Sequence, residues 1–91
     1  MTKKERAVIT VMGVDHPGIV AAVTTELAKL KVNIEDISQT ILQDFFTMIM
    51  IVDVSGIKRS EVQKALDRVS DNQKVKIIMQ HEGLFRYMHR V

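Results

Sequence analysis

The sequence predicts an α+β fold in which a four-stranded antiparallel sheet carries two helices on one of its faces. Three observations lead to this prediction. Four segments show the period-two alternation of strands, and two others show the spacing of amphipathic helices. Their order along the chain is strand, helix, strand, strand, helix, strand, which is the split βαβ arrangement. Right-handed crossovers then place both helices on the same face of the sheet.

A sharp turn separates the first strand from the first helix. Residues 6–13 alternate and are rich in β-branched side chains, so we expect a strand that is apolar on both faces. In the following turn, Pro17 suits the first position of a helix, and Asp15 or His16 suits its cap. Residues 19–31 then follow helical spacing.

The middle of the chain predicts a hairpin. Asn33–Leu42 returns to period two, which puts Ile37 on the side of Asn33 and Ile34 on the opposite side. Gln43 and Asp44 make the tight turn, and residues 45–54 form the most strongly apolar strand, again on both faces.

The second half ends with a helix, a strand and a short tail. Ser60 and Gln63 predict a capping box at the helix start, and Asp71 and Asn72 predict its end. The apolar stripe of this helix consists of Val62, Ala65, Leu66 and Val69. The last strand alternates Val75, Ile77 and Met79 with polar residues. We therefore expect one ferredoxin-like domain over residues 1–91, with a core of about 6–82 and a terminal helix or tail over 83–91.

Composition excludes several classes of protein. The chain of 91 residues has no cysteine, which excludes disulfides, a cysteine nucleophile and a thiolate metal site. The net charge of +2 is scattered, whereas a nucleic-acid surface needs a concentrated basic stripe. The apolar run near the start lacks a small-residue cleavage site, and no run reaches the roughly 20 residues that span a bilayer. We expect a cytoplasmic protein that binds neither nucleic acid nor membrane.

The third strand presents a packing problem. Two helices on one face leave the other face of the sheet bare, yet this strand is apolar on both sides. An exposed apolar sheet face is a site for association. We therefore predict that the terminal segment or a second chain covers it, and that the protein is a homodimer or a higher even oligomer.

Several segments resemble the ACT domain family, and the resemblance covers nearly the whole chain. The first two are Asp15-His16-Pro17-Gly18-Ile19-Val20 and, at the start of the second strand, Val32-Asn33-Ile34. Two more look similar to the small stand-alone ACT proteins of unassigned function: Asp36-Ile37-Ser38-Gln39-Thr40 and Phe45-Phe46-Thr47-Met48. The resemblance implies a regulatory module that binds an amino acid or a related small effector at an interface between two domains.

The resemblance also implies which positions contact that ligand. They lie in the turn and helix start on one side and in the second strand of a neighbouring domain on the other: Asp15, His16, Pro17, Gly18, Ile19, Val20, Asn33 and Ile34. ACT domains normally serve an attached enzyme or DNA-binding domain. None is visible in this sequence, so the process that the ligand would control is left open.

The chemistry of three of these residues suits an amino acid. A helix N-terminus beginning near Gly18 offers free N–H groups to a carboxylate, and glycine lets the ligand approach the backbone. Asp15 suits the ammonium group, and Asn33 both donates and accepts hydrogen bonds. The alternatives are that Pro17 and Gly18 only turn the chain, that Asp15 caps the helix and that Asn33 is a turn residue.

Other functions have weaker support in the sequence. The spacing of His16, His81 and His89 predicts no metal site, and no cofactor is expected. Met48, Met50 and Met79 are expected in the core or an interface. An RNA-recognition sheet needs an aromatic residue on the first strand, and this strand has none. An acylphosphatase-like enzyme needs an arginine in the first loop, and this loop has none. The prediction is a non-catalytic ligand-binding module, and the alternative is a protein-interaction module without a small ligand.

Overall fold

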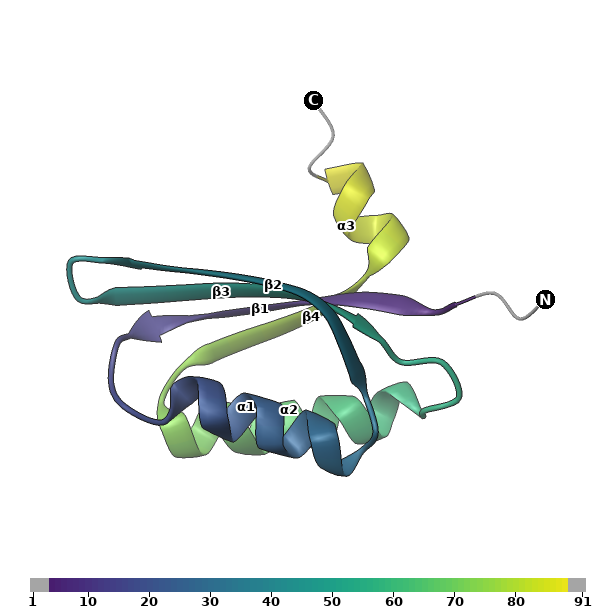
Figure 1. The fold of residues 1–91 in the computed structure, drawn as a ribbon, viewed down its shortest axis with the longest axis horizontal. Coiled ribbons are helices and arrows are strands. Elements are labelled where there is room, and N and C mark those ends of the chain that lie inside the picture. The colour runs from purple at the N-terminus through teal and green to yellow at the C-terminus, as the bar shows by residue number, and fades with distance from the viewer. Residues whose placement is uncertain (1–3, 89–91) are drawn as a thin grey trace.

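The computed structural model describes the backbone of residues 4–88 and the side chains of residues 4–85. In chain order the elements are β1 (Arg6–Val14), α1 (Ile19–Lys29), β2 (Asn33–Leu42), β3 (Phe45–Asp53), α2 (Arg59–Gln73), β4 (Lys76–His81) and α3 (Glu82–Met88). The strands form one antiparallel sheet in the order β2-β3-β1-β4. Figure 1 shows α1 and α2 together on one face of this sheet and α3 on the other. The predicted fold class is confirmed.

The hydrophobic core lies between the sheet and the pair α1 and α2. Ile9, at the centre of β1, is fully buried and stands in register with Met50 of β3 and Met79 of β4. The two helices supply the other side of this core. Ile19, Val23 and Leu27 are buried from α1, and the predicted stripe of Val62, Ala65, Leu66 and Val69 is buried from α2. The methionines expected in the core are there: Met48 and Met50 are fully buried, and Met79 packs against them in part.

One irregularity in β2 changes the predicted alternation. Ile34 pairs with Val52, and the next pair is Asp36 with Ile51, so Glu35 is an extra residue without a partner in β3. Such a β-bulge shifts the side chains that follow it to the other face. Ile34 and Ile37 therefore both face the helix side, and the predicted separation of these two side chains was wrong.

The predicted helix starts were also wrong in detail. Gly18 is the N-cap of α1, so Pro17 lies in the preceding turn, and no side chain caps this helix. In α2 the N-cap is Lys58, again without a side-chain cap, and the Gln63 amide donates to Asp67 instead of closing a capping box with Ser60. This helix also continues past Asn72 to Gln73.

The second sheet face is covered at one end only. Val8 points to this face, because its neighbours in β1 point to the core, and yet Val8 is only 2% exposed. The short helix α3 contacts β1 and β4 on this side and accounts for that burial. Toward the β2–β3 hairpin the same face remains open, and its large apolar side chains are exposed: Met12, Val14, Leu42, Phe45, Ile49 and Ile78.

Removing residues 83–91 should destabilise the fold, because Val8 would then face water. Burying a large aliphatic side chain contributes about 1.5–3 kcal/mol, so we expect a loss at the lower end of that range by urea unfolding. Phe85→Ala should give much of the loss, because that ring is half-buried, whereas Leu84→Ala should give little, because Leu84 is 52% exposed. An unchanged unfolding curve after truncation would contradict the role given to α3. The predicted packing of the Met88 side chain lies outside the described side chains.

Candidate functional site

The loop between β1 and α1 is held at two points. The backbone N–H of Asp15 donates to the carbonyl oxygen of Asp44 at 2.7 Å, which ties the loop to the turn of the β2–β3 hairpin. The ring of His16 lies between two backbone carbonyl oxygens, with Nε2 at 2.7 Å from Gln73 and Nδ1 at 3.0 Å from Pro17. These contacts fix the loop against both the sheet edge and the C-terminal end of α2.

The N-terminus of α1 is open at this loop. Gly18 has a φ of 95°, a left-handed conformation that glycine adopts without steric cost. The first N–H groups of a helix have no partner within the helix, and here neither a capping side chain nor an acidic residue of the first turn compensates them. The partial positive charge of this end is therefore available to an anion from outside the chain.

The predicted site residues of the loop fall into two groups. Asp15, Pro17 and Gly18 are exposed, and the His16 ring is partly buried by its contacts. Ile19 is buried and Val20 packs against the core, so their side chains face inward, and only their backbone groups lie at the loop. The loop thus offers the exposed carboxylate of Asp15 and, a few residues further along the chain, the backbone N–H groups of the α1 N-terminus.

The other predicted residues lie at the opposite end of the sheet. Val14 pairs with Phe45 at the start of β3, and Asn33 pairs with Asp53 at its end. Eight residues along a strand span roughly 26 Å. Asn33 is exposed and Ile34 packs partly against the core. One chain therefore does not bring Asn33 to its own Asp15 loop, and a site that uses both needs two chains.

Paired charges surround the Asn33 end. Glu35 accepts hydrogen bonds from Lys4 at 3.0 Å and from Arg6 at 2.8 Å, and these bonds hold the pKa of this carboxyl below its usual value. The bonds that Ser55 donates to Asp53 lower the pKa of that carboxyl in the same way. These charges have partners within the chain, so this end offers Asn33 as its neutral polar group.

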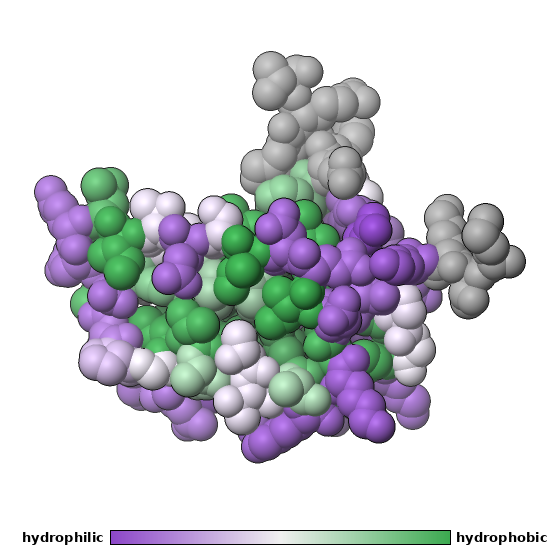
Figure 2. Space-filling view, viewed as in Figure 1, coloured by the Kyte–Doolittle hydropathy of each residue, from purple (hydrophilic) through white to green (hydrophobic). Residues whose placement is uncertain are grey.

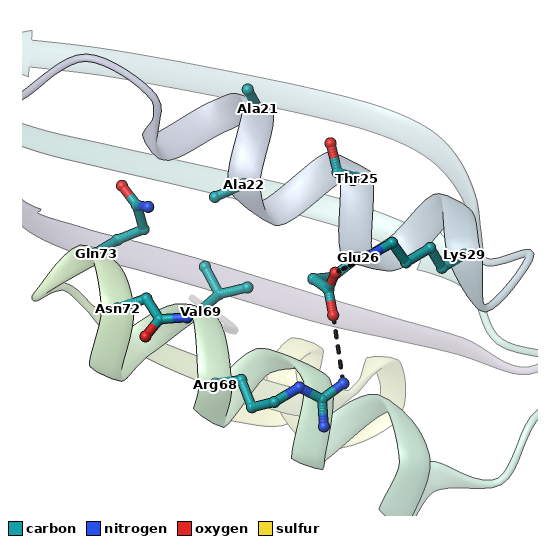
Figure 3. Close-up of a pocket in the computed structure, with 9 residues that line it drawn as sticks. All are labelled: Ala21, Ala22, Thr25, Glu26, Lys29, Arg68, Val69, Asn72 and Gln73. Carbon is teal, nitrogen blue, oxygen red and sulfur yellow. Dashed lines mark hydrogen bonds and ion pairs between the residues drawn. The ribbon is translucent and has the colours of Figure 1, made fainter.

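A separate open groove of about 680 Å³ lies between α1 and α2 (Figure 3). Ala21, Ala22 and Val69 line it with small apolar side chains. At one end the carboxylate of Glu26 accepts from Lys29 and from Arg68, and these bonds lower its pKa. Asn72 and Gln73 lie at the other end. The charges of this groove already pair with one another, whereas the N-terminus of α1 has no capping side chain.

The described residues contain neither a cluster of metal-ligating side chains nor a membrane-spanning helix. Among residues 4–88, no three histidine or acidic side chains come together in a way that could hold a metal ion. None of the helices in that range is both long enough and apolar enough to cross a membrane.

Comparisons with known proteins agree with the fold. The model of the ACT domain family matches residues 5–80, and the chain belongs to that family. A UPF0237 protein of Methanococcus maripaludis is 55% identical over 89 residues, which cover 96% of this chain and 99% of the relative. An ACT domain protein from Streptococcus pneumoniae, solved as a structure, is 36% identical, with a TM-score of 0.79 over 91% of this chain and 96% of the other.

A more distant structure shares the fold alone. It is described as a putative glycine cleavage system transcriptional repressor, is 24% identical and gives a TM-score of 0.79 over 88% of this chain and 47% of the other. The chain is thus a small ACT domain whose relatives span the same length.

The sequence did not indicate the contact between His16 and Gln73. These residues are 57 positions apart, and only the packing of α2 beside the loop brings them together. The Glu26–Arg68 pair was missed for the same reason. The one signal in the sequence is the histidine in the Asp15–Gly18 turn. The sequence predicts a helix cap or a ligand contact for it, and the structure gives its ring bonds to Pro17 and Gln73 instead of a cap.

Proposed function

We propose that this ACT domain is a cytoplasmic, non-catalytic regulatory module that binds a small amino acid between two copies of the chain. Family membership supports the class of function. The observation that carries the site is the open N-terminus of α1 at the Gly18 turn, where no side chain of the first turn supplies a negative charge. The carboxylate of Asp15 beside it provides the acceptor that an ammonium group requires.

The position of β2 explains how a second copy would complete the site. This strand is at the edge of the sheet, so its outer N–H and C=O groups have no neighbouring strand. Antiparallel pairing of two β2 strands places the start of one beside the end of the other. The partner's Asn33 then lies near the hairpin turn, and that turn is bonded to the Asp15 loop through Asp44.

The surface of this edge favours such an interface. Ile37 and Ile41 of β2 face the helix side, but α1 leaves them exposed by 44% and 52%. Figure 2 shows hydrophobic residues gathered across the middle of the molecule, between hydrophilic residues at both ends. An interface with an apolar centre and a polar rim is typical of protein association.

In this site the groups of an amino acid each have a partner. The backbone N–H groups after Gly18 would bind the carboxylate. Asp15 would bind the ammonium, and the partner's Asn33 would fix the orientation. A small side chain is expected, because the loop lies close to both the hairpin turn and the end of α2.

Thermal unfolding with each of the twenty amino acids and common nucleotides tests this proposal. A ligand that binds only the folded protein at a hundred times its dissociation constant stabilises by about 2.7 kcal/mol. We expect at least one amino acid to raise Tm by more than about 5 °C at millimolar concentration. Asn33→Ala should abolish that increase and leave the unliganded Tm nearly unchanged, because Asn33 is exposed.

Asn72→Ala is the matched control, since Asn72 is an exposed asparagine of the groove between α1 and α2. It should leave the increase intact. If Asn72→Ala abolishes it and Asn33→Ala does not, the ligand binds in that groove. If no amino acid raises Tm, the function as a protein-interaction module takes the place of the proposal.

A further inference from the structure

The imidazole of His16 lies between two hydrogen-bond acceptors. Nε2 is 2.7 Å from the carbonyl oxygen of Gln73, and Nδ1 is 3.0 Å from that of Pro17. Both distances are those of hydrogen bonds, and a carbonyl oxygen can only accept. Each of these two bonds therefore forms only when the ring nitrogen concerned carries a proton.

Protonation changes how many of these bonds form. Neutral imidazole has a single N–H, so one of its nitrogens then directs a lone pair at a carbonyl oxygen. Imidazolium has two N–H groups and satisfies both acceptors at once. The geometry around His16 fits the charged ring, and loss of its proton breaks one of the two bonds.

The end of α2 adds to this preference. Gln73 is its last residue, and its last turn has no basic side chain. The carbonyl groups of a helix C-terminus favour a cation, and His16 supplies one from a different part of the chain. The bond to Gln73 and then the bond to Pro17 raise the pKa of His16, burial opposes them, and the carboxylate of Asp15 raises it further.

Other charged residues belong to the elements packed around the ring. They are Asp44 in the hairpin turn, Asp71 and Lys74 at the end of α2, and Lys76 at the start of β4. Among the described residues, the charge found to act on the pKa of His16 is that of Asp15.

We propose that His16 is a proton-dependent latch that holds the β1–α1 loop against the C-terminal end of α2. The latch is closed when the ring is charged and loses one bond when the ring is neutral. The latch lies beside the N-terminus of α1, because Gly18 follows His16 by two residues and a Cβ added at Gly18 would lie 3.9 Å from the side-chain oxygen of Gln73. If the proposed function is right, the same latch makes ligand binding at the loop stronger in mild acid than in mild alkali.

The sign of the effect on stability follows from the raised pKa. A group with a higher pKa in the folded state contributes stability that is complete below the unfolded value, about 6.5 for histidine, and is lost as pH rises through the folded value. His16→Gln should therefore lower Tm by about 3 °C at pH 5.5 and by much less at pH 9. His81→Gln is the control at an exposed histidine of β4. Its Nδ1 accepts from the Gly83 N–H at 3.0 Å, a bond that needs an unprotonated nitrogen, so any loss of Tm in this variant should not be larger at pH 5.5 than at pH 9.

NMR titration of the imidazole signals, compared between the wild type and His16→Gln, measures the latch without any ligand. We expect His16 to titrate above 6.5 and to show two bonded N–H protons at pH 5.5. A His16 pKa at or below 6.5, or an equal loss of Tm at both pH values, would overturn the proposal. Both measurements are made without an amino acid, so they test the latch even if the ligand screen finds nothing. If the screen identifies an amino acid, its affinity for the wild type and for His16→Gln is compared afterwards.

Discussion

Ile9→Ala should cause one of the largest losses of stability that a single substitution can produce in this fold. Ile9 is fully buried at the centre of the sheet, in register with Met50 and Met79. Truncating a buried isoleucine to alanine costs about 2–5 kcal/mol, because apolar contact is lost and a cavity is left. A domain of 91 residues has a total stability of roughly 5–14 kcal/mol. We expect Tm to fall by more than about 10 °C.

Ile78→Ala makes the same chemical change on the opposite face of the sheet, and urea unfolding at low protein concentration compares the two. Ile78 is 37% exposed, so it loses less buried surface, and its cost should be under half that of Ile9→Ala. Equal losses at low concentration would mean that the open face is as well covered within one chain as the helix side. A loss for Ile78→Ala that grows with concentration would place this side chain in an interface between copies.

The sequence predicted the fold because its signals are repeated in every element. Each strand alternates and each of the two long helices carries an apolar stripe, so one misread position does not change the type of element. The exact bounds of β2 could be predicted for the same reason. The bulge at Glu35 could not, because an extra residue in one strand shows only when its partner is known.

The helix ends were harder to predict, because local preference competes there with packing. Ser60 and Gln63 have the residue types and spacing of a capping box with Ser60 as the N-cap. The N-cap of α2 is instead Lys58, two residues earlier, and Gln63 has Asp67 as a partner. At α1 the turn needed a left-handed residue, and Gly18 provides it, which moves Pro17 out of the helix. The proline and glycine of this turn predicted a loop between β1 and α1. They did not predict the bonds of His16 to Pro17 and Gln73.

The edge strand β2 combines features that block association with features that favour it. The bulge at Glu35 and the bond from the Ile37 N–H to its neighbour Asp36, at 2.9 Å, both blunt the first half of the strand. That bond also shows that the Ile37 N–H points away from β3. Because alternate residues of an antiparallel strand face the same side, the N–H groups of Gln39 and Ile41 also point outward. The second half of β2 thus offers unpaired donors beside exposed apolar side chains.

Gln39→Pro should convert the protein from an oligomer to a monomer, and this is the largest effect that we expect on assembly. Proline removes the outward N–H of Gln39 and places its ring against any strand that pairs there, while the bonds between β2 and β3 stay. Light scattering at micromolar concentration should give at least twice the chain mass of 10.4 kDa for the wild type and for Gln39→Thr. The proline variant should give the single mass with an unchanged circular dichroism spectrum.

Ile49→Asp tests whether two copies associate through the β2 edge or through the open sheet face. Ile49 lies on that face, 38% exposed, and a carboxylate there would be buried without a partner if two faces met. We expect Ile49→Asp to remain an oligomer, because pairing through β2 leaves this side chain in water. If Ile49→Asp is a monomer and Gln39→Pro is not, the open face is the interface. Asn33 then has no reason to meet the Asp15 loop of a partner. A wild type that scatters as a monomer would contradict both arrangements.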